Sequence, residues 1–196
     1  MYRHMKAASR EDSVSSAIYA IAGAMLIVGL LAAFAWLPRL IHARESEQVG
    51  KDAPVVKVPL VLNAEQLTEP PALPPASIGT DELKGHAVVL DFWATWCPPC
   101  KAEMPIIDRV ASRYKSRGLV VVGINTSDGE GAGAAWAKSH GISYPIAFDA
   151  ENEAARAYGV ETLPTIVVIS KTGKVVARRT GVTDADELER LVNQAL

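Results

Sequence analysis

The sequence predicts an α/β fold in which a central mixed sheet is flanked by helices and preceded by one transmembrane helix. Three observations lead to this expectation. Short apolar runs alternate with longer helical stretches, which favours parallel strands joined by helices on both faces of a sheet. Residues 171–174 are typical of a turn that joins two strands as a hairpin. Residues 17–37 carry no charge over 21 positions, about the length of a membrane-spanning helix.

The predicted strands are short and almost continuously apolar, as expected of strands that are buried on both sides. They span residues 88–93, 119–124, 144–148, 165–169 and 175–179, with 55–58 as a candidate for one more. The predicted helices span residues 98–117, 132–140 and 152–158. A last helix begins after Asp184, a suitable N-cap, and places Leu188, Leu191 and Val192 on one face.

Residues 17–37 are the predicted membrane anchor, and residues 1–16 are the cytoplasmic tail before it. Tyr19 and Trp36 lie near the two ends, where amphipathic rings favour the membrane interface. Two alternatives stay open. A signal peptide could be cleaved at A-F-A, residues 33–35, although the apolar run is longer than usual for one. A buried soluble helix is the other, although a helix that is apolar all round has no face for solvent.

Charge gives little guidance on orientation or on partners. Three basic residues precede the apolar stretch and three follow it closely, so the positive-inside rule gives no decision. We place the N-terminus inside and the C-terminal domain outside because of the redox chemistry and the family resemblance given below. The formal net charge is only −2, and no nucleic-acid partner is expected.

Residues 38–77 are predicted as a Pro-rich linker and N-terminal extension of a compact domain at 78–196. Residues 68–76 are T-E-P-P-A-L-P-P-A, and Pro-rich stretches are stiff and extended. Such a spacer would hold the domain clear of lipid headgroups. The alternative, that the segment packs as an irregular extension of the domain, stays open.

The chain has two cysteines, Cys97 and Cys100, three positions apart. A disulfide-stapled scaffold needs more cysteines, so the pair is redox-active, part of a zinc site, or inert. Structural zinc takes four ligands, and the four histidines include no pair at the usual spacing. Two inert cysteines would not need to lie at the junction of a strand and a helix. We therefore expect a redox pair that works without a metal or another cofactor.

Cys97 is the predicted nucleophile because it directly precedes the predicted helix 98–117. The free N–H groups and the positive dipole end of a helix N-terminus stabilise a thiolate, which is the reactive species in thiol exchange. We expect Cys97 to be exposed and to attack, and Cys100, one turn deeper, to resolve the mixed disulfide. Pro98 suits the first helical position, and Pro98 and Pro99 together help to set the reduction potential.

Two motifs resemble those of a known family. Residues 91–101, D-F-W-A-T-W-C-P-P-C-K, resemble the active-site signature of thioredoxins. Residues 93–105 more closely resemble that of the membrane-anchored TlpA/ResA/DsbE-type thiol–disulfide oxidoreductases of bacterial envelopes, and Y-G-V-E-T-L-P-T at 158–165 resembles their second signature. The resemblance covers residues 78–196. It implies a thioredoxin fold with a helix–strand insertion between residues 132 and 158.

The resemblance also implies roles for individual residues. Pro164 would be a cis-proline packed beside the disulfide, and Leu163 would offer backbone hydrogen bonds to a substrate chain. Trp96 would cover one side of the site, and Glu103 would tune the pKa values of the cysteines. From the residues alone, Pro164 could be an ordinary trans-proline and Glu103 could simply favour the helix dipole.

Asp91 departs from the tethered family, which often has asparagine at this position, and matches plain thioredoxins instead. There a buried aspartate assists proton transfer to the second cysteine. A carboxyl group in an apolar strand has a raised pKa, which suits a base that works near neutrality. Plain thioredoxins pair this aspartate with a lysine on the next strand, whereas residues 119–124 contain none. We expect Asp91 to act as a proton shuttle with little electrostatic compensation.

The expected function is that of a reductase that faces the cell envelope, anchored in the bacterial inner membrane by a single span at residues 17–37. A membrane thiol donor of the DsbD/CcdA kind would keep the cysteine pair reduced. The resemblance suggests apocytochrome c, or a copper-site protein of a terminal oxidase, as the substrate. One rival is a disulfide oxidase or isomerase, because the same motif serves both directions. Another is an anchored binding or chaperone module without turnover, which would not need a resolving thiol.

Overall fold

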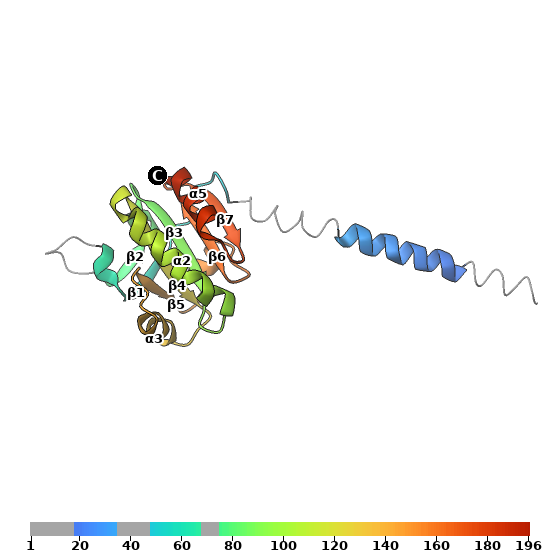
Figure 1. Cartoon of the computed structure of the whole chain (residues 1–196), viewed down its shortest axis with the longest axis horizontal. Coiled ribbons are helices and arrows are strands. Elements are labelled where there is room, and N and C mark those ends of the chain that lie inside the picture. Colours follow the sequence, from blue (N-terminus) through green and yellow to red (C-terminus); the bar gives the residue numbers. More distant parts are fainter. Residues whose placement is uncertain (1–17, 35–47, 68–74) are drawn as a thin grey trace, which may run out of the picture. The chain divides into compact units, whose positions relative to one another are not determined.

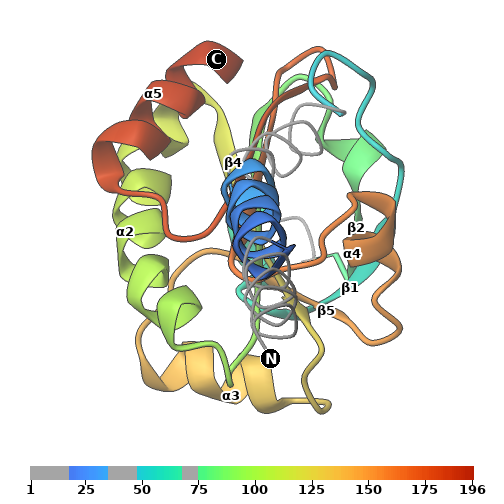
Figure 2. The same cartoon turned by 90° about the vertical axis from the view of Figure 1, so that its right-hand side faces the viewer.

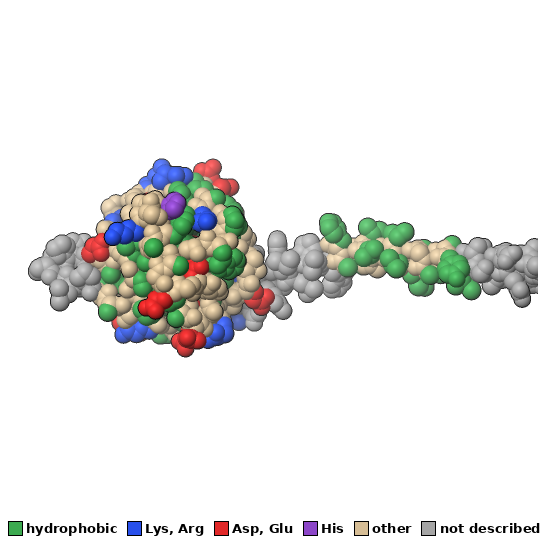
Figure 3. Space-filling model, turned by 90° about the horizontal axis from the view of Figure 1, so that it is seen from below, with side chains coloured by type: hydrophobic (Ala, Val, Ile, Leu, Met, Phe, Trp, Pro, Cys, Tyr) green, Lys and Arg blue, Asp and Glu red, His purple; other side chains and the backbone are tan. Residues whose placement is uncertain are grey.

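The computed structural model describes residues 18–34, 48–67 and 75–196. Residues 18–34 are helical, and they belong to a different compact unit from the domain that follows. The side chains along this helix are exposed and largely hydrophobic (Figure 3). Within the described ranges, no helix combines the length and the hydropathy that a membrane span requires. The ends of the predicted anchor, the predicted tail 1–16 and part of the A-F-A motif lie outside these ranges.

The domain is built on a seven-stranded mixed sheet (Figure 1). The strands are β1 (Lys57–Leu62), β2 (Ser77–Gly79), β3 (Ala87–Trp93), β4 (Leu119–Thr126), β5 (Ile146–Asp149), β6 (Thr165–Ile169) and β7 (Val175–Thr180). They lie in the order β2-β1-β5-β4-β3-β6-β7. Strands β3, β4 and β5 are parallel, as expected from the alternating units, and the remaining pairs are antiparallel.

Helices cover both faces of the sheet (Figure 2). They are α2 (Pro98–Tyr114), α3 (Ala132–Ser139), α4 (Glu153–Ala157) and α5 (Ala185–Ala195), with short 3-10 turns η1 (Ala64–Leu67), η2 (Thr80–Leu83) and η3 (Lys115–Arg117). Helices α2, α3 and α5 pack on one face, and α4 packs on the other. Gly118, with φ +89°, ends η3 in the left-handed region that favours glycine and turns the chain into β4.

The apolar runs of the sequence form strands β3, β4, β6 and β7, in agreement with the prediction. The main difference lies within residues 38–77, which contribute β1, η1 and the first residue of β2. The segment before β1 also joins the domain, because Gly50 N–H donates to the Val175 carbonyl and Ala53 N–H to that of Gly173. The predicted extension therefore joins the domain from about residue 48 and becomes a regular part of the sheet at β1, and the Pro-rich residues 68–74 lie outside the described ranges.

Alternation along β3 decides which of its side chains reach the site. Val88, Leu90 and Phe92 point into the core under α4. Val89 and Trp93 point into the opposite core, which contains Cys97 and Cys100 of the first turn of α2. Asp91 lies between Val89 and Trp93 in the strand, so its carboxyl group faces the same layer as the cysteines. It is only 1% exposed.

Candidate active site

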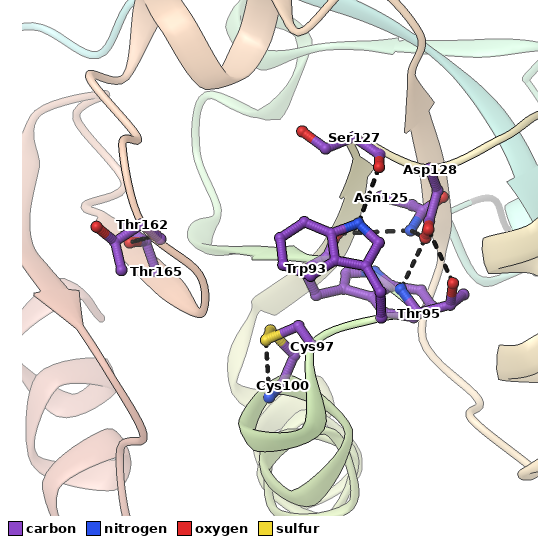
Figure 4. The surroundings of a disulfide bond; sticks show 10 residues. Trp93, Thr95, Cys97, Cys100, Asn125, Ser127, Asp128, Thr162 and Thr165 are labelled. Carbon is purple, nitrogen blue, oxygen red and sulfur yellow. Dashed lines mark hydrogen bonds between the residues drawn. A yellow bond between two sulfur atoms is a disulfide. The ribbon is translucent and has the colours of Figure 1, made fainter.

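The two cysteines form a disulfide at the N-terminus of α2 (Figure 4). Cys97 is the N-cap residue of the helix, and its Sγ accepts a hydrogen bond of 3.2 Å from the backbone N–H of Cys100. Pro98 and Pro99 occupy the first helical positions, where an N–H has no intrahelical partner. The backbone therefore directs a hydrogen-bond donor and the positive end of the helix at the sulfur of Cys97.

The prediction that Cys97 is exposed is wrong for this disulfide-bonded form. Cys97 is 3% exposed and Cys100 is 1% exposed. As the N-cap, Cys97 turns its sulfur back over the helix end toward the N–H of Cys100, which takes it away from solvent. The neighbouring Trp96, in contrast, is 61% exposed and extends from the same turn. A partner that approaches the disulfide therefore meets the indole as well as the sulfur.

The Leu163–Pro164 peptide bond is cis, as the family resemblance implies. Pro164 is buried and Leu163 is half-buried at the start of β6. The turn before β6 faces the disulfide in Figure 4, and the Thr165 hydroxyl there donates to the Thr162 carbonyl at 2.7 Å. The Pro164 carbonyl accepts a 2.9 Å hydrogen bond from Gly181 N–H, which joins this turn to the loop after β7.

Trp96 is held by the loop that follows β4. Its indole N–H donates to the Ser127 carbonyl at 2.9 Å. Ser127 has φ +58°, an unusual conformation for a residue with a side chain. The side-chain oxygen of Asn152 stabilises this conformation because it accepts from Ser127 N–H at 3.0 Å and also from the Thr126 hydroxyl.

Asp128 fixes the turn that leads into Cys97. Its carboxylate accepts from the backbone N–H of Thr95 at 2.7 Å, from the Thr95 hydroxyl at 2.8 Å and from the Asn125 side-chain amide at 2.7 Å. Asn125 is itself buried at the end of β4. Hydrogen bonds to an ionised acceptor are among the stronger ones, so this loop network fixes the entry to the helix.

Asp91 lies beneath the cysteines and is paired with a tyrosine. The Tyr144 hydroxyl donates to Asp91 Oδ2 at 3.0 Å, and both residues are buried. Asp91 Oδ1 is buried and makes no hydrogen bond within the part of the chain that the structure describes. Burial, together with the nearby Glu103, raises the pKa of Asp91 to about 8, although the Tyr144 hydrogen bond lowers it. The direction agrees with the prediction from the apolar strand.

Glu103 is the second carboxyl group of this layer. It lies one turn after Cys100 on the same face of α2 and is fully buried. Its Oε1 accepts from Thr183 N–H at 2.6 Å, and its Oε2 is buried with no hydrogen-bond partner among the described residues. Burial raises the pKa of Glu103 to about 7, while the Thr183 hydrogen bonds lower it. Two buried acids with raised pKa values therefore share the layer that contains the resolving cysteine.

Three residues of the site were not predicted from the sequence: Asp128, Gly123 and Tyr144. Each had a signal. Asp128 lies two residues after the end of β4, and polar residues after a parallel strand commonly reach the functional edge of a sheet. Gly123 interrupts an apolar strand, which often marks the close approach of another group. The signal at Tyr144 was weaker: a tyrosine within an apolar stretch is expected to be buried, and its hydroxyl then needs a hydrogen-bond partner. In the described ranges, no group of three or more acidic, histidine or cysteine side chains is arranged to hold a metal ion.

The comparisons with known proteins agree with this geometry. Curated relatives include the thiol-disulfide oxidoreductase ResA of Bacillus thuringiensis (strain Al Hakam), which is 33% identical over 146 residues, 74% of this chain and 78% of the relative. ResA of Bacillus subtilis (strain 168) is 38% identical over 104 residues, 53% of this chain and 58% of the relative. The chain is accordingly a thiol–disulfide oxidoreductase. Residues 48–195 match the Redoxin family model, and the chain belongs to this family.

Solved structures agree on the thioredoxin-like fold. The thiol:disulfide interchange protein, a thioredoxin family protein from Chlorobium tepidum TLS, is 27% identical with a TM-score of 0.60, and the match covers 74% of this chain and 94% of that one. StoA from Bacillus subtilis is similar in fold, with a TM-score of 0.56, 23% identity and coverage of 71% of this chain and 96% of that one. The matching family region begins at residue 48, which is also the first residue of the second described range, and the Gln48 side-chain amide donates to the Ala157 carbonyl at 3.1 Å.

Proposed function

We propose that this oxidoreductase works as a reductase: the reduced Cys97–Cys100 pair transfers two electrons to a disulfide of a partner protein. The observation that carries the proposal is the buried pair of carboxyl groups, Asp91 and Glu103, in the layer beneath the cysteines. A thiol–disulfide couple is oxidising when the protein stabilises its thiolate form. Negative charge and an apolar surrounding both destabilise thiolates, and so favour the disulfide form and a reducing couple.

At Cys97 the helix N-terminus has the opposite effect, because it stabilises the thiolate. The stabilising effect therefore falls on Cys97 and the destabilising effect on Cys100. Cys97 receives the Cys100 N–H and the helix dipole, which promote its attack on a partner disulfide. Cys100 lies one turn deeper, on the side of Glu103. Its thiol therefore stays protonated until the mixed disulfide has formed. This division keeps an attacking thiolate at the helix N-terminus without making the pair a strong oxidant.

The reaction balances in two steps. The Cys97 thiolate attacks one sulfur of the partner disulfide, a mixed disulfide forms, and the other partner sulfur leaves as a thiolate. Cys100 then gives up its proton and attacks Cys97 Sγ, which forms the intramolecular disulfide and releases the second partner sulfur. The pair loses two electrons and the partner gains them. We assign the uptake of the Cys100 proton to Asp91, with Glu103 tuning the charge of the layer.

Residues around the disulfide supply a surface for the partner chain. We assign the cover of the site to Trp96, which the Ser127 carbonyl holds, and the backbone contact with substrate to Leu163. We assign the other side of the substrate surface, across from Trp96, to Pro164, which follows a cis peptide bond. Pro98 and Pro99 fill the first turn between the sulfurs without adding N–H donors.

We also propose that the domain is tethered on the extracytoplasmic side of the bacterial inner membrane. The support is the uncharged stretch 17–37, of which residues 18–34 form a helix with an exposed apolar surface. A membrane thiol donor of the DsbD/CcdA kind would reduce the pair, and apocytochrome c or a copper-site protein would be its substrate. This part rests on the family resemblance. Extraction of the full chain from membranes with alkaline carbonate tests it, because an anchored chain stays in the pellet and a peripheral one is released.

Trapping the mixed disulfide tests the proposed reductase and names its substrate. In Cys100→Ser the attack by Cys97 still occurs but resolution does not, so partners accumulate as covalent adducts. We expect mass spectrometry of these adducts to identify envelope proteins that carry a reducible cysteine pair. Cys97→Ser is the matched control and should trap nothing. Equal trapping by the two variants, or adducts confined to cytosolic proteins, would contradict the proposal.

A further inference from the structure

Tyr144 reaches the proton-handling layer from outside the thioredoxin-like strands. It lies in the segment between α3 and β5, inside the insertion predicted at 132–158, and is 3% exposed. Its hydroxyl donates to Asp91 Oδ2 at 3.0 Å. Among the described residues, this is the one hydrogen bond recorded for the side chain of Asp91.

Gly123 makes room for the tyrosine ring. In the parallel register of β3 and β4, Gly123 lies directly opposite Asp91. A Cβ atom at Gly123 would lie 3.0 Å from Tyr144 Cε2, 3.2 Å from Trp93 Nε1 and 2.7 Å from Ile146 Cδ1. Only a glycine therefore lets the phenol pass β4 to the carboxyl group. The phenol of Tyr144 therefore lies next to Asp91, and β4 contains no lysine or arginine.

Two separate contacts fix the backbone that carries Tyr144. Asp108 Oδ1, on α2, accepts from both the N–H and the hydroxyl of Ser143 at 2.8 Å. The side-chain amide of Asn63 donates to the carbonyls of Ile142 and Tyr144 at 2.9 and 3.1 Å. The tyrosine is thus anchored to the helix that bears the cysteines and to the turn after β1. Its hydroxyl position is set by the fold.

Among the described groups that surround Asp91, Tyr144 is the one that stabilises its ionised form. Glu103 approaches from α2 and disfavours the ionised form of Asp91. From β4 the opposite residue is Gly123, and from β6 it is the apolar Ile166. Burial and the nearby carboxyl groups raise the pKa of Tyr144 well above its ordinary value, so the phenol stays a donor throughout the working pH range.

We propose that Tyr144 is a positioning residue for proton transfer at Cys100: it holds Asp91 by Oδ2 and leaves Oδ1 free to take the proton. The inference rests on the proposed function. In the step, the Cys100 thiol gives its proton to the Asp91 carboxylate. The Cys100 sulfur then attacks Cys97 Sγ in the mixed disulfide. The Cys97–Cys100 bond forms, the bond from Cys97 to the partner breaks, and the partner sulfur leaves with the electron pair. The insertion thereby supplies a neutral group in place of the lysine of plain thioredoxins.

Tyr144→Phe tests the inference because it removes the hydroxyl and keeps the ring. The measurement is the single-turnover rate of mixed-disulfide resolution from pH 6 to 9.5. A hydrogen bond to a carboxylate favours its ionised form, so its loss raises the pKa of Asp91 above the value of about 8. We expect the midpoint of the rate profile to move up by about half a unit to one unit, with a roughly three- to tenfold slower rate at pH 7.

The matched control is Tyr114→Phe. Tyr114 is also buried on the α2 face and donates to a carboxylate, Glu189 Oε2, at the same distance of 3.0 Å. We expect its profile to keep the wild-type midpoint. In the Asp91→Asn background, Tyr144→Phe should cause no further loss. A direct titration of the Asp91 carboxyl carbon by NMR in the oxidised protein gives a second readout and should show the same upward shift.

The outcomes separate this inference from the proposed function. A Tyr144→Phe profile that coincides with the wild-type profile would overturn the inference while trapping by Cys100→Ser still supports the function. An equal loss of rate in the Asp91→Asn background would also overturn it, because the tyrosine would then act on structure alone. Failure of the wild-type chain to reduce any partner disulfide would instead remove the function itself.

Discussion

The two sides of the disulfide differ in how their polar groups are satisfied. On the loop side, each carboxylate oxygen of Asp128 accepts from Thr95, and the Trp96 indole N–H has its own acceptor. On the buried side, Asp91 and Glu103 each keep one oxygen without a partner among the described residues. The first arrangement fixes a shape. The second leaves two acids with raised pKa values in the layer that contains the disulfide, and perturbed pKa values of this kind are typical of functional sites.

This contrast has an energetic meaning. A buried polar atom without a hydrogen bond costs about 1–3 kcal/mol, a large part of the free energy of unfolding of a domain. Selection for stability alone would remove such atoms. Neutral substitutions of Asp91 or Glu103 should therefore raise the free energy of unfolding while they impair the chemistry. Substitutions on the loop side should only lower the free energy of unfolding.

Asp91→Asn gives the largest expected effect on stability. The pKa of Asp91 is raised from 3.8 to about 8, so the folded protein retains a proton that the unfolded chain loses above about pH 4. The free energy of unfolding therefore falls as the pH rises from about 4 to 8, the window between the pKa of Asp91 in the unfolded and the folded chain. At pH 8 we expect Asp91→Asn to be more stable than wild type by about 2–4 kcal/mol in urea unfolding of the oxidised form, and at pH 4 to be nearly equal.

Asp149→Asn is the control with the opposite sign. Asp149 is also buried, but its two oxygens accept from the N–H groups of Ala154 and Ala155 at 3.1 and 2.9 Å. The amide replaces an acceptor by a donor, so this variant should lose stability at both pH values. Equal behaviour of the two asparagine variants would remove the distinction between a buried acid with both oxygens hydrogen-bonded and one with an oxygen that has no partner.

Asp128→Ala tests the loop side. The variant loses three hydrogen bonds to a carboxylate, and we expect the free energy of unfolding to fall by about 2–3 kcal/mol. The rate of exchange should fall because the turn before Cys97 loosens. The midpoint of its pH profile should stay where it is in the wild-type protein, as measured by stopped-flow kinetics. A moved midpoint would show that the loop side also handles protons.

Trp96→Phe gives the smallest expected effect. The indole is mostly exposed, so loss of its hydrogen bond to Ser127 should change the free energy of unfolding by about 0.5 kcal/mol or less. Reduction of a protein disulfide should nevertheless slow more than reduction of a small disulfide, because the aromatic surface meets only the larger substrate. Equal slowing with both substrates would remove the assigned role of Trp96 in partner contact.

The sequence predicted most of the central fold because its signals are local. The apolar runs became β3, β4, β6 and β7, and the Cys-Pro-Pro-Cys motif placed the disulfide at a helix N-terminus. Strand β1, K-V-P-L-V-L at Lys57–Leu62, was missed in most of its length because Pro59 and its short apolar pattern resemble a linker. Its partners β2 and β5 are distant in sequence, so its pairing is a tertiary effect.

The sequence predicted the single residues of the candidate site that carry chemistry. It did not predict the contacts between them and residues of other segments. Asp91 and Glu103 were singled out from their motif, and both are buried. The Tyr144 hydroxyl, the gap at Gly123 and the Asp128 carboxylate act through contacts between residues 21 to 53 positions apart. Such contacts depend on strand register and side-chain packing, which apolar periodicity does not encode.

The reduction potential of the Cys97–Cys100 pair tests the central claim most directly. If buried acids destabilise the thiolates, the wild-type value at pH 7 should lie below about −220 mV, near the thioredoxin value of about −270 mV. In Asp91→Asn/Glu103→Gln the potential should rise, and the difference should widen from pH 7 to pH 8 as the wild-type acids ionise. A wild-type value near that of the oxidant DsbA, about −120 mV, or a double variant with an unchanged potential at both pH values, would contradict the account.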